Sequence, residues 1–182
     1  MLPGCFFMLE FSYDRAAVLR YAERWALARN PAYYDFDPLG GDCTSFVSQC
    51  LFAGAGVMNF SPENGWYYVN LSDRSPSWSG VEPLYRFLTS NRGPGPFGSP
   101  VAAESLLPGD VIQLGAPDGS FYHSLLVLEV SPPRIFVAAH TNDALWRPLD
   151  SYDFARLRGI HIDGVREQEK DRFESGLFLV YA

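Results

Sequence analysis

The order of two hydrophobic patterns constrains the fold of this chain more than any other feature. Over 12–28 and 43–53, apolar residues recur at the spacing of an amphipathic helix. After the Pro- and Gly-rich connector 92–100, the pattern changes to short aliphatic and β-branched runs, which predict strands at 109–114, 122–130, 134–140 and 158–162. Helices followed by a group of strands are typical of an α+β domain, in which N-terminal helices pack on an antiparallel sheet.

Capping and helix-breaking residues mark the ends of the predicted helices. Ser12 is the expected cap of the first helix, and Asn30-Pro31 ends it. Asp42 is the expected cap of the second helix, and the glycines at 54 and 56 end it. A third, short helix is predicted over 81–91, and the segment 59–79 is expected to be a loop rich in Trp, Tyr, Ser and Asn.

The composition bounds the size of the protein and its partners. With 182 residues, 47% of them hydrophobic, the chain can form one domain, and its core is expected at about 13–162. The remainder, 163–182, contains a charged run followed by a tail or last strand. The net charge of −7 argues against a nucleic-acid partner. No stretch is long enough to span a bilayer, and neither a cofactor nor an oligomeric state is indicated.

The first eleven residues are apolar, but they do not have the pattern of a secretory leader. They lack a basic start, and they already include an acidic residue, Glu10. As it stands, the sequence predicts a cytoplasmic protein. A leader upstream of Met1 would instead direct the protein to the cell envelope or out of the cell.

Cys43 follows Gly40-Gly41-Asp42 and is predicted to occupy the first turn of the second helix. There its sulfur would lie beside unpaired backbone N–H groups and the positive end of the helix dipole, which lower the pKa of a thiol. Cys43 is therefore a candidate nucleophile. The alternative is that it is a small buried core residue.

The three cysteines, Cys5, Cys43 and Cys50, are an odd number, which argues against a disulfide framework. Seven residues on one helix separate Cys43 from Cys50 by roughly 10 Å along the axis. A disulfide needs Cα atoms within about 7 Å, so this pair cannot form one. Cys50 lies on the apolar stripe of the helix and is expected in the core.

A nucleophilic cysteine needs a base, and two of the three histidines lie at the ends of predicted strands. If these strands form a hairpin around Pro132-Pro133, residues whose numbers sum to 265 are paired, so that His123 faces Asn142. On this register His123, His140 and Asn142 share one face, with the two histidine backbones roughly 7–8 Å apart. A slip of one residue would put the two histidines on opposite faces. His161 has no such polar neighbours and is expected to be structural or exposed.

Two further groups of residues allow more than one interpretation. Cys43, His123 and His140 would make a zinc site with Asp143 as fourth ligand, but no CxxC or HxxxH spacing supports it, and no metal is expected. The aromatic residues of the 59–79 loop would either line a substrate groove or anchor the loop in the core; they are Trp66, Tyr67, Tyr68 and Trp78.

The stretch "YDRAAVLRYAERWALARNPAYYDFDPLGGDCTSFVSQCL", followed by "PGDVIQL", "HSLLV" and "AAHTND", resembles the putative amidase domain family. That family is related to the NlpC/P60 and CHAP groups of papain-like cysteine peptidases. The resemblance implies a papain-like fold of the NlpC/P60 type, with the nucleophile at a helix N-terminus and the base at the start of a core strand. Cys43, His123 and His140 match the nucleophile, the base and the third polar residue.

Residues and resemblance together predict a cysteine amidase or peptidase that cleaves amide bonds through a thioester. Cys43 attacks and His123 moves the proton, while His140, or Asn142 in its place, orients the imidazole. The backbone N–H of Cys43 and the neighbourhood of Asp42 are the expected oxyanion donors. By resemblance, the substrates are peptides of the bacterial cell wall. The alternatives are a non-catalytic module that binds peptidoglycan or peptide, and an acyltransferase or deamidase with the same residues.

Overall fold

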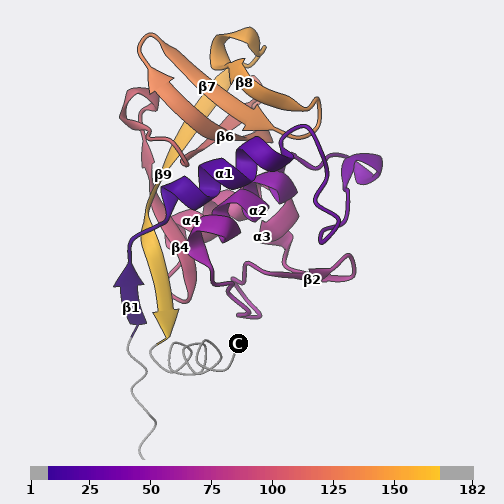
Figure 1. Cartoon of the computed structure of the whole chain (residues 1–182), viewed down its shortest axis with the longest axis vertical. Helices are drawn as coiled ribbons and strands as arrows, with labels where there is room; N and C mark the ends of the chain where they lie inside the picture. Colours follow the sequence, from indigo (N-terminus) through magenta and orange to yellow (C-terminus); the bar gives the residue numbers. More distant parts are fainter. Residues whose placement is uncertain (1–7, 169–182) are drawn as a thin grey trace, which may run out of the picture.

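The computed structural model describes residues 8–168, and its main element is an antiparallel sheet of seven strands (Figure 1). The order of the sheet is β1-β9-β5-β6-β7-β8, and β4 pairs with β9 outside this path. The strands are β1 (Met8–Phe11), β4 (Gly95–Val101), β5 (Val111–Gly115), β6 (Phe121–Ser131), β7 (Arg134–Ala139), β8 (Ala144–Pro148) and β9 (Arg156–Gln168). A separate two-stranded ribbon consists of β2 (Tyr68–Asn70) and β3 (Asp73–Arg74).

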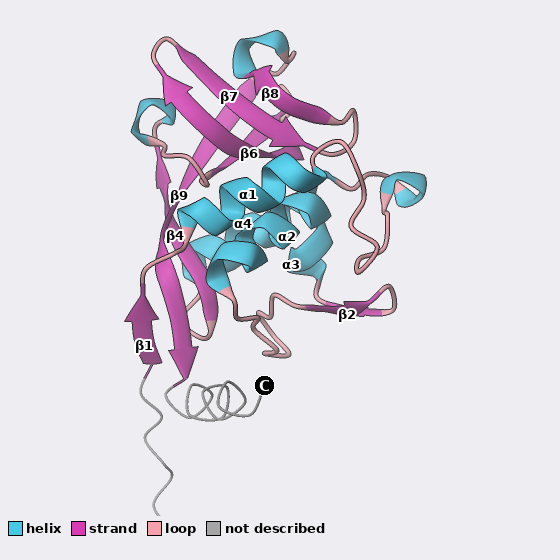
Figure 2. Ribbon diagram, viewed as in Figure 1, coloured by secondary structure: helices cyan, strands magenta, loops and turns pink. Residues whose placement is uncertain are grey.

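Four α-helices lie together beside the sheet (Figure 2), so the predicted α+β class is confirmed. They are α1 (Arg15–Trp25), α2 (Cys43–Ala55), α3 (Pro76–Ser79) and α4 (Val81–Ser90), and short 3₁₀ turns occur at Asp37–Leu39, Ala103–Ser105 and Leu149–Ser151. Within the described residues, no helix has the length and apolar character needed to cross a membrane.

Helix α2 is the central helix, because its residues from 43 to 51 are all buried. It contacts α1, α3 and β6. Phe46 and Leu51 have no exposed surface, and each contributes about 1.5–3 kcal/mol by its removal from water. The helix thereby holds its first turn, and Cys43 with it, at a fixed place against the sheet.

The two faces of the sheet pack against different hydrophobic clusters. Along β6, Leu126 and Leu128 pack with the helices, whereas Leu125 and Val127 belong to a second cluster with Leu149 beyond the other face. This alternation is the period-two pattern of a strand that is buried on both sides. The polar residues at the start of β6 follow the same alternation, so Ser124 faces the helices and His123 faces the opposite side of the sheet.

The predicted hairpin register is correct near the turn and wrong beyond it. Ser131 pairs with Arg134 and Glu129 with Phe136, which gives the expected sum of 265. The register then shifts between Val127 and Glu129, so that Val127 pairs with Val137, a sum of 264. An extra residue in one strand, a β-bulge, has this effect and moves all later residues by one position.

Three boundaries also differ from the sequence-based expectations. Asp14, not Ser12, caps α1, because its carboxylate accepts from the N–H of Ala17 at 2.9 Å. Helix α2 continues to Ala55 and ends at Gly56, whose φ of +69° permits the left-handed turn. The expected connector 92–100 contains β4, which pairs along β9. The expected C-terminal tail, 176–182, lies outside the described residues.

Candidate active site

Cys43 and His123 line the same pocket, at the N-terminal end of α2 and the start of β6. Both residues are thus brought together from positions eighty residues apart in the chain. The other residues that line this pocket are Gly40, Gly41, Leu114, Tyr122, Thr141, Asn142, Arg147, Tyr152 and Asp153. We call this hollow the cysteine pocket.

Cys43 is the first residue of α2 and is 7% exposed. Burial raises the pKa of its thiol above the usual value, and the backbone N–H of Ser124 and the side chain of Thr44 offset this only in part. The sequence-based expectation of a thiol pKa lowered by the helix terminus is therefore not met. Desolvation is the larger effect at this site, so the resting group is a neutral thiol.

His123 is also held in its neutral form. Burial, together with the charge of Arg147, lowers the pKa of its imidazole to about 4. Its ring lies 6.0 Å from that of Tyr152, and no described residue forms a hydrogen bond with it. At neutral pH the pocket of the free protein therefore contains a protonated thiol and a neutral imidazole with a free ring nitrogen, and the two pKa shifts oppose proton transfer between them.

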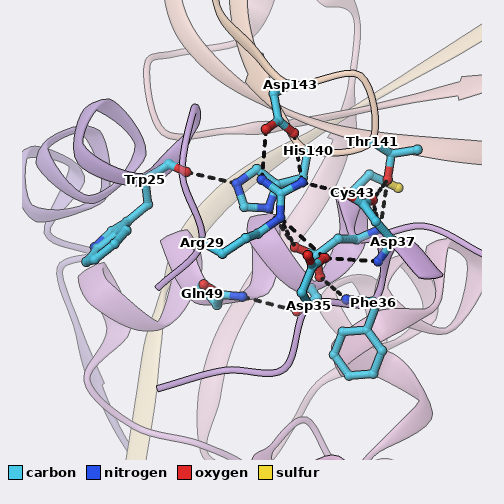
Figure 3. Close-up of polar contacts among 12 residues, drawn as sticks. Trp25, Arg29, Asp35, Phe36, Asp37, Cys43, Gln49, His140, Thr141 and Asp143 are labelled. Carbon is cyan, nitrogen blue, oxygen red and sulfur yellow. Dashed lines mark hydrogen bonds and ion pairs between the residues drawn. The ribbon is translucent and has the colours of Figure 1, made fainter. Parts of the chain in front are cut away.

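His140 does not line the cysteine pocket but packs against Phe46 of α2, and Figure 3 shows its polar contacts. Its Nδ1 is 2.6 Å from the carboxylate of Asp42, its Nε2 is 2.9 Å from the carbonyl oxygen of Trp25, and its ring stacks on Phe46 at 4.1 Å. Ser124 contacts Thr44 of α2 at 3.0 Å, so its neighbour His123 faces away from the helix. The shared face expected for the two histidines is thus corrected, because of the β-bulge in β6.

Asp42 is the buried member of a partly exposed charge network that sequence reasoning did not identify. Arg29 contacts the carboxylates of Asp35, Asp37, Asp42 and Asp143 (Figure 3). This arginine thereby joins the segment before Cys43 to the turn between β7 and β8. The one available signal in the sequence is the cluster of three aspartates within 35–42 beside a helix that ends near Arg29.

Thr141 connects the same turn to Asp42, the residue before Cys43. Its hydroxyl accepts from the backbone N–H of Asp42 at 2.7 Å and donates to Asp37 at 2.8 Å. Gly41 allows this approach, since a Cβ there would lie 3.1 Å from the Thr141 hydroxyl oxygen. Although its partial burial would raise the pKa of Asp37, the hydroxyl of Thr141 and the guanidinium of Arg29 lower it.

These contacts change the roles available to two expected residues. The backbone N–H of Asp42 is occupied by Thr141, so it is not free to donate to an oxyanion. The backbone N–H of Cys43 remains available, because the first N–H groups of a helix have no partner within it. Asn142 lines the cysteine pocket, whereas both ring nitrogens of His140 are already engaged by Asp42 and Trp25.

The aromatic residues of the 59–79 loop do not line the cysteine pocket. Trp66 and Trp78 have no exposed surface, and the centres of their rings are 5.1 Å apart. Trp66 also stacks on Phe87 in the core. Tyr67 stacks on Phe60 and lines a different hollow. These tryptophans anchor the loop, which is the alternative role that the sequence allowed.

The remaining candidates are engaged elsewhere. The imidazole of His161 lies 2.8 Å from Asp110, and Cys50 is fully buried in the core. Asp143, the fourth ligand of the zinc hypothesis, binds Arg29 with both carboxylate oxygens. Among the described residues, no group of three or more His, Cys, Asp or Glu side chains is arranged to hold a metal ion.

Fold and pocket together define an α+β protein with a buried cysteine at a helix N-terminus and a neutral histidine across the same pocket. The chain belongs to the putative amidase domain family, whose model matches residues 12–162. Membership in this family points to hydrolysis of amide bonds.

One curated relative is an uncharacterized protein, YhbB, of Bacillus subtilis strain 168. It is 34% identical over 140 residues, which are 75% of this chain and 44% of the relative. The match therefore spans less than half of that protein. No solved structure gives a significant match to this chain.

Proposed function

We propose that this protein is a cysteine amidase with a papain-like arrangement, in which Cys43 is the nucleophile and His123 the base. The observation that carries the proposal is that both residues line one pocket, with the cysteine on the first turn of a buried helix. Family membership supports amide hydrolysis, and the neutral imidazole of His123 has a ring nitrogen available to accept the thiol proton.

The reaction is proposed to proceed in two halves. The sulfur of Cys43 forms a bond to the carbonyl carbon of the amide, and its proton moves to a ring nitrogen of His123. His123 then gives this proton to the leaving nitrogen as the C–N bond breaks, which leaves a thioester on Cys43. Water loses a proton to His123, attacks the thioester, and releases a carboxylic acid; the proton returns to the sulfur.

The N-terminal end of α2 is the proposed site for the negative charge that develops on the carbonyl oxygen. The backbone N–H of Cys43 has no partner within the helix, and the helix dipole favours an anion there. Asp42 would oppose such an anion, but Arg29 contacts its carboxylate and compensates its charge, and His140 lies within hydrogen-bond distance of the same carboxylate. His140 is thus proposed to act on the oxyanion site through Asp42, and Asn142 is the candidate to orient His123.

Cell-wall peptides are the proposed substrates, on the basis of the resemblance to NlpC/P60 and CHAP proteins. The cysteine pocket lies between loop residues 40–41 and the turn at 141–142, so a peptide would approach over backbone with little side-chain bulk at Gly40 and Gly41. Acyl transfer to another amine would use the same thioester and is distinguished by its products.

Purified peptidoglycan and mass spectrometry of the released fragments test the proposal. We expect fragments with new free carboxyl groups from the unmodified protein and none from Cys43→Ala. His123→Gln should reduce the rate by about 100- to 10,000-fold, the range for loss of a general base. His161→Gln, a histidine outside the pocket, is the matched control and should retain activity.

Two results would count against the proposal. Equal release of fragments by Cys43→Ala would exclude a cysteine mechanism on this substrate. If iodoacetamide did not modify Cys43, or modified it equally in the His123→Gln variant, these two residues would not form a catalytic pair.

A further inference from the structure

Arg147 of β8 lines the cysteine pocket and is fixed before any substrate binds. Its Nε donates to the hydroxyl of Ser151 at 2.9 Å, and one terminal nitrogen donates to the carbonyl of the same residue at 3.1 Å. Its guanidinium carbon lies 3.8 Å from the centre of the Tyr152 ring. The side chain is thus held by two hydrogen bonds and a cation–π contact, and it loses little freedom when it binds a ligand.

The charge of Arg147 has no counter-ion in the described part of the chain. No carboxylate lies within 4.0 Å of it, although Asp153 lines the same pocket. Beyond Ser151, its guanidinium interacts with the hydroxyl of Tyr152, which is uncharged, so its charge is not compensated within the described residues. By contrast, Arg29, Arg15, Arg158 and Arg166 each contact a carboxylate. Other arginines, such as Arg24, Arg74 and Arg134, also have no carboxylate contact, but Arg147 alone among the described arginines lines the cysteine pocket.

The hydroxyl of Tyr152 is a second donor without an acceptor at the same place. It is buried, and although Arg147 can donate to its oxygen, its own proton has no acceptor among the described residues. Burial raises the pKa of Tyr152, and the nearby charge of Arg147 offsets the rise in part. Because arginine can only donate, Arg147 cannot accept the proton of this hydroxyl. The guanidinium of Arg147 and the hydroxyl of Tyr152 are therefore both donors that a charged oxygen acceptor would satisfy.

We propose that Arg147 and Tyr152 form a subsite for a carboxylate group of the substrate, so that the preferred substrates are amides with a free carboxylate close to the scissile bond. A carboxylate only accepts hydrogen bonds, and its two oxygens match the two donors. The inference rests on the proposed function, because it assigns the substrate class of the same pocket.

Such a subsite would also couple substrate binding to the base. The positive charge of Arg147 is one cause of the lowered pKa of His123. A bound carboxylate would compensate that charge, so the pKa of His123 would rise and the imidazole would become a stronger base. A neutral substrate would leave His123 as it is in the free protein.

A pair of alkylating probes tests the subsite without knowledge of the natural substrate. Bromoacetyl-glycine carries a carboxylate, and bromoacetyl-glycinamide carries a neutral amide on the same reactive group. The rate of Cys43 alkylation by each is measured by peptide mass spectrometry. We expect the rate of Cys43 alkylation by the carboxylate probe to be about ten- to a hundredfold higher than the rate with the neutral probe. This ratio corresponds to the usual free energy of a hydrogen bond to a charged group. The preference should weaken as salt is added.

Variants identify the source of the preference. Arg147→Gln should abolish it, Arg147→Lys should retain part of it, and Tyr152→Phe should reduce it. Arg134→Gln, an exposed arginine at the far end of the β6–β7 hairpin, removes the same charge and should leave the preference unchanged. If Cys43 reacts normally but the rate ratio is the same in Arg147→Gln, the subsite is excluded. Failure of Cys43 to react with either probe would instead contradict the proposed nucleophile.

A binding measurement tests the subsite even if alkylation fails. In Cys43→Ala, the ring resonances of His123 are followed while N-acetylglycine or N-acetylglycinamide is added. We expect the carboxylate compound alone to shift them and to raise the pKa of His123 from about 4. Equal effects of both compounds, or equal effects in Arg147→Gln, would overturn the proposal.

Discussion

At the scale of single residues, the cysteine pocket stabilises two neutral groups side by side. Burial raises the pKa of the Cys43 thiol and lowers that of the His123 imidazole, so the same desolvation acts in opposite directions on an acid and a base. In the free protein the proton therefore stays on sulfur, so the pocket differs from a preformed thiolate–imidazolium pair. In the mechanism that we propose, charge separation would coincide with bond formation.

The lowered pKa of His123 predicts a loss of stability in mild acid. In the unfolded chain the imidazole of His123 binds a proton near pH 6.5, whereas in the folded protein it binds one only near pH 4. The stabilising contribution of a neutral His123 is thus complete above pH 6.5 and is lost as the pH falls toward 4. Linkage gives a loss of about 2 kcal/mol by pH 5. Urea unfolding at pH 7.5 and pH 5 measures it.

His123→Gln provides the control for this linkage, since glutamine does not titrate in this range. The free energy of unfolding of the unmodified protein should fall more between the two pH values than that of His123→Gln. An equal fall in the original protein and in His123→Gln would show that His123 titrates normally in the folded state.

At the scale of elements, the turn between β7 and β8 carries unusual backbone strain. Thr141 and Asn142 have φ values of +60° and +70°, as the two central residues of a type I′ turn require. Asparagine tolerates this conformation, but a β-branched residue does not, and the cost is about 1–2 kcal/mol. In return for this cost, the turn places the Thr141 hydroxyl where it accepts a hydrogen bond from the backbone N–H of Asp42, just before Cys43.

Thr141→Gly should therefore separate stability from activity. Glycine removes the strain and the hydroxyl together, so we expect the free energy of unfolding to change by less than about 1 kcal/mol. The rate of Cys43 alkylation by iodoacetamide should fall about tenfold or more, because the start of α2 loses its tie to the turn.

Thr141→Ser keeps the hydroxyl and should react like the unmodified protein, which makes it the matched control. A Thr141→Gly variant that reacts normally would show that the hydroxyl has no positioning role. A large loss of stability in that variant would show instead that the turn is not strained.

The same two strands show what the sequence could and could not predict. Apolar periodicity located α2 and the strands β5, β6, β7 and β9, because each buries a regular set of side chains. It could not reveal the bulge near Leu128, since an extra residue in one strand leaves the local pattern of both strands intact. That bulge decides the faces of His123 and His140, so their separation was not predictable.

Other differences have equally local causes. The strand β4 contains Pro96 and Pro100, which argue against a strand in general but are tolerated where one edge is unpaired, and β4 pairs with β9 alone among the described strands. At the site, the first turn of α2 was predicted because Asp42 and the preceding glycines mark a helix start. The raised pKa of Cys43 was not, because it depends on burial that only the packed molecule defines.

At the scale of the whole molecule, one buried carboxylate joins the two ends of the described chain. Asp110, next to β5, has no exposed surface and contacts Arg15 of α1 at 2.8 Å and His161 of β9 at 2.8 Å. It also accepts from the backbone N–H groups of Leu107 and Ile162. The first helix is thereby fixed to the last strand, and this contact closes the frame around α2.

Asp110→Asn is expected to reduce the free energy of unfolding by about 3 kcal/mol, because it leaves the charge of Arg15 without its partner and replaces one acceptor by a donor. Asp163→Asn is the matched control: this carboxylate is exposed and bonded to Ser99, so the same change should cost less than about 0.5 kcal/mol. Urea unfolding of both variants measures the difference.

Since α1 also carries the carbonyl of Trp25 that holds His140, Asp110→Asn should slow Cys43 alkylation as well, although Asp110 lies outside the cysteine pocket. A variant that loses stability but alkylates at the original rate would show that the helix–strand tie supports the fold without positioning the site.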